Sequence, residues 1–102
     1  MTDKQYPELY DQIQAFAFDD AAAEFPFAAR LAKENDWKAE FTERVIEEYK
    51  KFMFLAVAAG HPVTPSDQVD QAWHLHLLYT DSYWNQFCKQ VLGKAIHHGP
   101  TK

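Results

Sequence analysis

The sequence predicts an all-α fold: a single-domain bundle of four to five helices over residues 1–102, with a C-terminal helical hairpin and an irregular tail. Three observations support this prediction. Apolar residues recur at helical spacing along several segments. Only three glycines and five prolines are present, which is too few for a turn-rich β fold. The 102 residues are 47% hydrophobic and 16% aromatic, so the chain can build one core and is not a disordered segment.

The first two helices are predicted from apolar spacing and from helix-ending residues. We expect one helix over residues 7–18, where Leu9 and Ile13 fall at helical spacing. A second helix follows Pro26, because proline suits the first turn, where its missing N–H costs little. Asn35 ends this second helix.

The longest helix is expected over residues 37–59. One stripe at helical spacing contains Phe41, Val45, Tyr49, Phe52 and Ala56. Charged residues occupy the other faces of its first half, whereas its second half is apolar all round. We therefore place this helix at the centre of the bundle.

Two further helices are expected to form the hairpin. Thr64 can cap the first of them, Pro65 fits its first turn, and the helix continues to Tyr79. The second covers residues 82–92 and is stopped by Gly93. The residues after Gly93 are expected to form the irregular tail.

Charge and targeting patterns exclude several classes of protein. Ten basic and fifteen acidic residues give a formal charge of -5, which argues against a nucleic-acid partner and against an anionic membrane surface. The longest apolar run, residues 52–59, is much shorter than the roughly 20 residues that span a membrane. The single cysteine, Cys88, cannot form an internal disulfide. We expect a soluble cytoplasmic domain with an unknown protein partner and an unknown oligomeric state.

A cluster of potential metal ligands lies in the C-terminal third. Four of the five histidines follow residue 70, and imidazole, carboxylate and thiolate together suit a divalent transition metal, zinc first. Asp70 and His74 are four residues apart and share a helix face. His76 lies about 200° around the helix from His74, so a regular helix does not aim both at one ion. The predicted ligands are His74, His76, Cys88 and His98, with Asp70 as a further ligand or as the partner that orients His74.

The predicted hairpin would bring these residues together. An antiparallel pair of helices places Cys88 level with His74 and His76. The tail after Gly93 then turns back, so that one of its adjacent histidines, at positions 97 and 98, approaches Asp70.

The same residues also have a metal-free interpretation. Cys88 shares an apolar stripe with Trp84 and Val91, which is typical of a buried structural cysteine. His74 is satisfied by Asp70 if the pair forms a hydrogen-bonded anchor. The alternative function is therefore a protein-interaction module in which these residues form a buried polar network.

In that module, exposed aromatic side chains contact the partner. Candidates for this role are Phe25, Phe27 and Trp37.

An enzyme is not expected. The sequence holds no phosphate-binding glycine loop, no G-x-S-x-G elbow and no H-E-x-x-H motif, and no catalytic residue is assigned. A cysteine-dependent enzyme, in which Cys88 is the nucleophile and a histidine is its base, is the weakest hypothesis. Metal-dependent hydrolysis would require an open position on the metal.

The C-terminal segment also carries a recognisable pattern. It reads V-D-x-x-W-H-x-H, followed by a Tyr, a Cys, a Gly and a final His close to Pro. The matching residues are Val69, Asp70, Trp73, His74, His76, Tyr83, Cys88, Gly93 and His98. This segment resembles the glycine-rich domain-containing protein-like family, a domain of unknown function in plants and bacteria. The resemblance covers residues 61–102 and implies a helical domain without an established activity.

Overall fold

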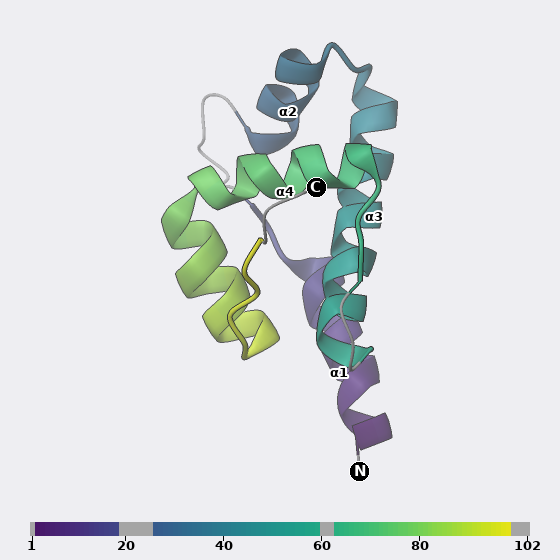
Figure 1. Cartoon of the computed structure of the whole chain (residues 1–102), viewed down its shortest axis with the longest axis vertical. Helices are drawn as coiled ribbons and strands as arrows, with labels where there is room; N and C mark the ends of the chain where they lie inside the picture. Colours follow the sequence, from purple (N-terminus) through teal and green to yellow (C-terminus); the bar gives the residue numbers. More distant parts are fainter. Residues whose placement is uncertain (1, 19–25, 60–62, 99–102) are drawn as a thin grey trace.

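The computed structural model of the chain describes residues 2–18, 26–59 and 63–98. Within these ranges the chain forms five helices and no strand, which confirms the all-α prediction (Figure 1). The helices are α1 (Thr2–Ala15), α2 (Phe27–Asn35), α3 (Ala39–Ala58), α4 (Asp67–Leu78) and η1 (Asp81–Leu92). The first four are α-helices, and η1 is a π-helix.

Helix α3 is central to the packing, as its apolar second half predicted. It contacts α1, α2 and α4, with α4 crossing it in Figure 1. Its buried residues are Thr42, Val45, Tyr49, Phe52 and Met53. Phe41, which was predicted to belong to this stripe, is exposed instead and packs edge-on against Trp37, with ring centroids 5.1 Å apart. The buried stripe therefore begins one residue later, at Thr42.

Helix α4 begins two residues after its predicted start. Ser66, rather than Thr64, caps it, because the Ser66 hydroxyl accepts a hydrogen bond from the Val69 N–H at 3.2 Å. Such a bond satisfies a donor that lacks a partner within the first turn. Pro65 consequently lies before the helix and not in its first turn.

The π-helix η1 changes which side chains face the core. Hydrogen bonds from residue i to i+5 bring residues five apart onto one side. Accordingly, the buried residues are Ser82, Phe87 and Leu92, together with Tyr83 and Cys88. Trp84 and Val91, which an α-helical period had grouped with Cys88, are only half-buried.

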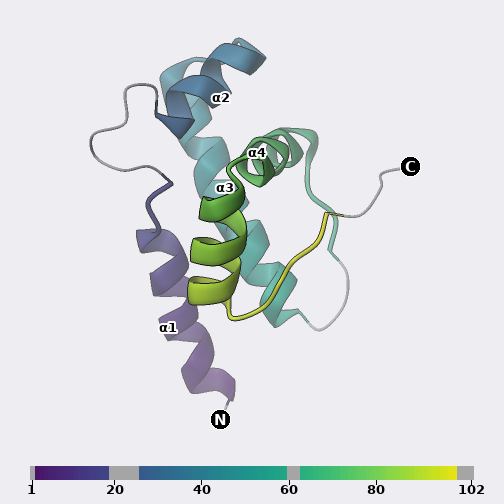
Figure 2. The same cartoon turned by 90° about the vertical axis from the view of Figure 1, so that its left-hand side faces the viewer.

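Gly93 turns the chain back toward α4. It has a left-handed conformation with φ of 69°, and its N–H donates to the Cys88 carbonyl. The Lys94 N–H donates to the same carbonyl at 3.0 Å. Figure 2 shows the tail after Gly93 turning back from the end of η1 and running up toward the segment that leads into α4. The predicted return of the tail is therefore present.

Replacing Gly93 by alanine is expected to lower the free energy of unfolding by about 1 kcal/mol, because L-residues disfavour this left-handed conformation. A Cβ at this position would meet no atom within 4 Å, so the loss would come from the backbone alone. Urea denaturation measures it, with Lys89→Ala on the exposed side of η1 as the control. A Gly93→Ala protein as stable as the wild type would contradict this interpretation.

Candidate metal centre

Helix α4 and the returning tail bring three polar side chains together. Asp70 and His74 lie on adjacent turns of α4, and His98 approaches them from the tail. His98 Nε2 is 2.5 Å from Asp70 Oδ1, and His74 Nε2 is 3.9 Å from Asp70 Oδ2. One donor atom from each of the three residues lies within 4.8 Å of the others. Three of the five residues predicted as ligands therefore lie close together.

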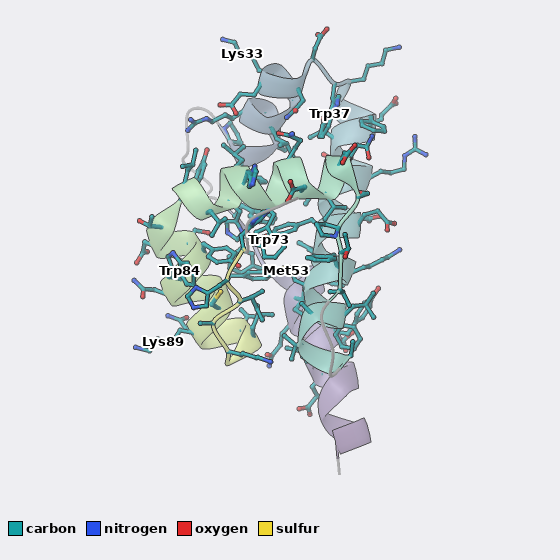
Figure 3. The ribbon with its side chains drawn as sticks, viewed as in Figure 1. Lys33, Trp37, Met53, Trp73, Trp84 and Lys89 are labelled. Atoms are coloured by element: carbon teal, nitrogen blue, oxygen red, sulfur yellow. The ribbon has the colours of Figure 1, made fainter. Side chains whose placement is uncertain are left out.

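A buried pair of hydrogen bonds holds the tail in this position. The Tyr83 hydroxyl donates to the Ile96 carbonyl at 2.5 Å and accepts from Trp73 Nε1 at 2.9 Å. The Trp73 ring also packs against the His98 ring, with centroids 4.4 Å apart. Trp73 lies on the inner side of α4 (Figure 3). Tyr83 thus fixes the chain two residues before His98.

The three side chains differ in their access to solvent. Asp70 and His98 are mostly covered, with side-chain exposures of 20% and 12%, whereas His74 is 54% exposed. The cluster is consequently anchored on one side by the tail and is open on the side of His74. A site with three protein donors and an open side can accept a further ligand from outside.

His97 points away from the cluster formed by Asp70, His74 and His98. Its ring packs against Trp84 of η1, with centroids 5.1 Å apart, and the residue is exposed. Between the two adjacent histidines of the tail, His98 is therefore the one that faces Asp70.

His76 lies in the core, apart from the cluster of Asp70, His74 and His98. Its Nδ1 is 2.8 Å from the Tyr49 hydroxyl, and its Nε2 is 3.0 Å from Ser82 Oγ. Aromatic rings surround it, with Phe18 the nearest at 4.6 Å between centroids. Burial lowers the pKa of His76 to about 3 because the charged imidazolium loses its hydration. Both ring nitrogens have partners, so the structure does not bring His76 to the cluster.

Cys88 is also buried away from the cluster. Its thiol interacts with the Tyr83 hydroxyl and the Ile96 backbone, and burial raises its pKa. A raised pKa disfavours the thiolate that a nucleophile or a metal ligand requires. The predicted hairpin had placed Cys88 level with His74. In Figures 1 and 2, however, η1 turns steeply away from the axis of α4. Among the described residues, Cys88 is not one of the three whose donor atoms lie within 4.8 Å of one another.

Comparison with known proteins places the chain in a family. Residues 10–102 match the family described as UCP032817-like. The chain belongs to the UCP032817-like family. The predicted resemblance to the glycine-rich domain-containing protein-like family is therefore wrong. The matching family is uncharacterised, and no curated protein or solved structure matches the chain.

In this UCP032817-like protein, Tyr49 and Ser82 hold His76 in place, and no site role was predicted for either of them. Tyr49 lies 27 residues before His76, so no local spacing could pair them. Tyr83 was identified as part of the C-terminal pattern, and the structure shows that its hydroxyl holds the tail. A buried aromatic residue with a hydroxyl is the one signal that could have indicated a polar partner.

The aromatic residues predicted to contact a partner are placed differently. Phe27 of the UCP032817-like chain is 1% exposed and stacks on Phe18 at 4.4 Å between centroids, so its predicted exposure is wrong. Trp37 is half-buried, and Phe25 lies outside the described residues. Within the described ranges, no helix has both the length and the apolar character to cross a membrane.

Proposed function

We propose that this UCP032817-like domain binds one divalent transition-metal ion through Asp70, His74 and His98. Zinc is the first candidate for this ion. The observation that carries this proposal is the meeting of three donor atoms, from α4 and from the tail, within 4.8 Å. Two imidazoles and one carboxylate are a common donor set for zinc. His76 and Cys88 are left out of this set because their polar atoms have partners in the core.

Only a small rearrangement is needed to seat the ion. Zinc bonds of about 2.0–2.1 Å in tetrahedral geometry place donor atoms roughly 3.3 Å apart. The His74 ring is exposed and can rotate inward from its 3.9 Å separation from Asp70. His98 and Asp70 would exchange their direct contact for bonds to the ion. The fourth position is then left to water or to an external ligand, and no catalytic residue is assigned.

The test is a calorimetric zinc titration of untagged protein that has been stripped of metal. One zinc per chain is expected, and His74→Ala, His98→Ala and Asp70→Asn should each weaken binding at least about tenfold. His97→Ala is the matched control, because His97 is adjacent to His98 but faces Trp84. Asp67→Asn, on the exposed first turn of α4, is the control for Asp70→Asn. A wild type that takes up no zinc, or equal losses in His97→Ala, would contradict the proposal.

A second candidate function is a metal-free protein-interaction module. It is favoured by the direct contact of His98 Nε2 with Asp70 Oδ1 and by the bonded His76 in the core. In this case the Asp70–His98 pair only fastens the tail. Thermal melts separate the two functions: in the metal-free module, zinc leaves the melting temperature unchanged, while Asp70→Asn lowers it even in chelator. The formal charge of -5 disfavours nucleic acid as the partner.

We propose a cytoplasmic setting for either function. A lone buried thiol with no second cysteine to pair with in the chain is typical of proteins from a reducing compartment.

A further inference from the structure

A surface groove adjoins the cluster of Asp70, His74 and His98. It lies between α2 and α4, which contact each other, and has a volume of about 440 Å³. This volume lies within the range of small-molecule sites, about 300–1,000 Å³. Its lining includes Asn35 from α2 and Gln71, His74, Leu75, Leu77 and Leu78 from α4. In Figure 1, α2 lies directly above α4.

His74 belongs both to the cluster and to the groove. Its Nε2 faces Asp70 at 3.9 Å, while the residue also lines the groove wall. Asp70 and His98 are held on the other side by the tail. An ion held by the three residues is therefore next to the groove. A ligand in the groove can reach the open position on this ion.

The charge of the filled site selects an anionic donor. A divalent cation with two neutral imidazoles and one carboxylate keeps a net charge of +1, which attracts a second carboxylate. Glu34 also lines the groove, but its carboxylate is paired with Arg30 at 2.9 Å. The paired Glu34 therefore does little to repel a bound anion.

The rest of the groove suits an apolar chain. Three leucines of α4 line it: Leu75 is buried, Leu77 is half-buried, and Leu78 is 68% exposed. A large, exposed leucine at the edge of a groove marks a surface that can bury apolar area against a ligand.

We infer that the groove binds a small monocarboxylate with an apolar chain, whose carboxylate occupies the open position on the metal held by Asp70, His74 and His98. The inference rests on the proposed metal site. It adds the class of ligand, an aliphatic carboxylic acid, and assigns Leu78 as a residue that contacts its chain.

The test is a calorimetric titration of zinc-loaded protein with octanoate and with acetate. Octanoate should bind at least about tenfold tighter than acetate, because its longer chain buries more apolar area. Chelation of the zinc should weaken octanoate binding at least about tenfold. Leu78→Ser should weaken octanoate binding while leaving acetate and zinc binding unchanged. Leu55→Ser, at another exposed leucine on α3, is the matched control.

Several results would overturn the inference. They are equal binding of octanoate and acetate, equal octanoate binding with and without zinc, and an unchanged octanoate affinity in Leu78→Ser. Zinc uptake is measured first, without any carboxylate, so failure of the metal site is registered separately. A wild type that binds zinc but not octanoate overturns only the inference, whereas one that binds no zinc overturns both.

Discussion

Acidification from pH 7 to pH 5 should lower the free energy of unfolding by about 2 kcal/mol through His76 alone. Burial lowers the pKa of His76 to about 3 in the folded protein, from an ordinary value of 6.5. Below pH 6.5 the unfolded chain binds a proton at His76 that the folded protein does not. The stabilisation is therefore complete above pH 6.5 and is lost as the pH falls toward 3, by about 4 to 5 kcal/mol in total.

The surroundings of His76 explain why its charged form is disfavoured. The ring bonds to the hydroxyls of Tyr49 and Ser82, and Tyr83 packs edge-on against it at 5.1 Å between centroids. Burial raises the pKa of both tyrosines, so the titratable groups that contact the ring stay neutral. None of these groups supplies the negative charge that would stabilise an imidazolium.

Urea denaturation of wild type and His76→Gln at pH 7, 6 and 5, in chelator, measures this effect. Glutamine keeps a donor and an acceptor but does not titrate, so the variant should lose about 2 kcal/mol less than the wild type over this range. His97→Gln is the control, because His97 is exposed and packs against Trp84 of η1, outside the surroundings of His76. An identical pH dependence in wild type and His76→Gln would show that His76 is not the responsible group.

Tyr83→Phe is expected to lower the free energy of unfolding by about 2 to 4 kcal/mol. The change leaves Trp73 Nε1 and the Ile96 carbonyl without the hydroxyl that joins them, and each buried group left unpaired costs about 1–3 kcal/mol. The same loss frees the tail that carries His98. Zinc affinity should therefore fall as well, by about 10- to 100-fold, as is usual for a residue that orients a metal ligand.

Urea denaturation and the zinc titration together check this prediction. Tyr79→Phe is the control, because the Tyr79 hydroxyl interacts with the exposed side chain of Arg30. A Tyr83→Phe protein with wild-type stability would show that the buried hydrogen bonds contribute nothing. Wild-type zinc affinity in a destabilised Tyr83→Phe would show that Tyr83 does not position His98.

Most helices could be predicted because their apolar residues recur with the α-helical period. The stripe of α3 shows this, with Val45, Tyr49 and Phe52 buried as predicted. Helix η1 was predicted as a segment but not as a π-helix, since its period of five is rare and an α-helical reading is the default. The error grouped Cys88 with Trp84, whereas the structure buries Cys88 on the side of Tyr83.

The candidate site was predictable on α4 and in the returning tail. Asp70 and His74 are one turn apart, and Gly93 indicated the turn that returns the tail. The partners of His76 were not predictable, because Tyr49 belongs to a different helix and meets it only through tertiary packing. For the same reason, spacing alone could not separate His98 in the cluster from a histidine in the core.

X-ray absorption spectroscopy of the zinc-loaded protein tests the central claim most directly. The site proposed from Asp70, His74 and His98 predicts two imidazoles and oxygen donors at about 2.0–2.2 Å, with no sulfur. A sulfur neighbour at about 2.3 Å would instead show that Cys88 leaves the core to bind the metal, and a spectrum without imidazole scattering would contradict the site altogether.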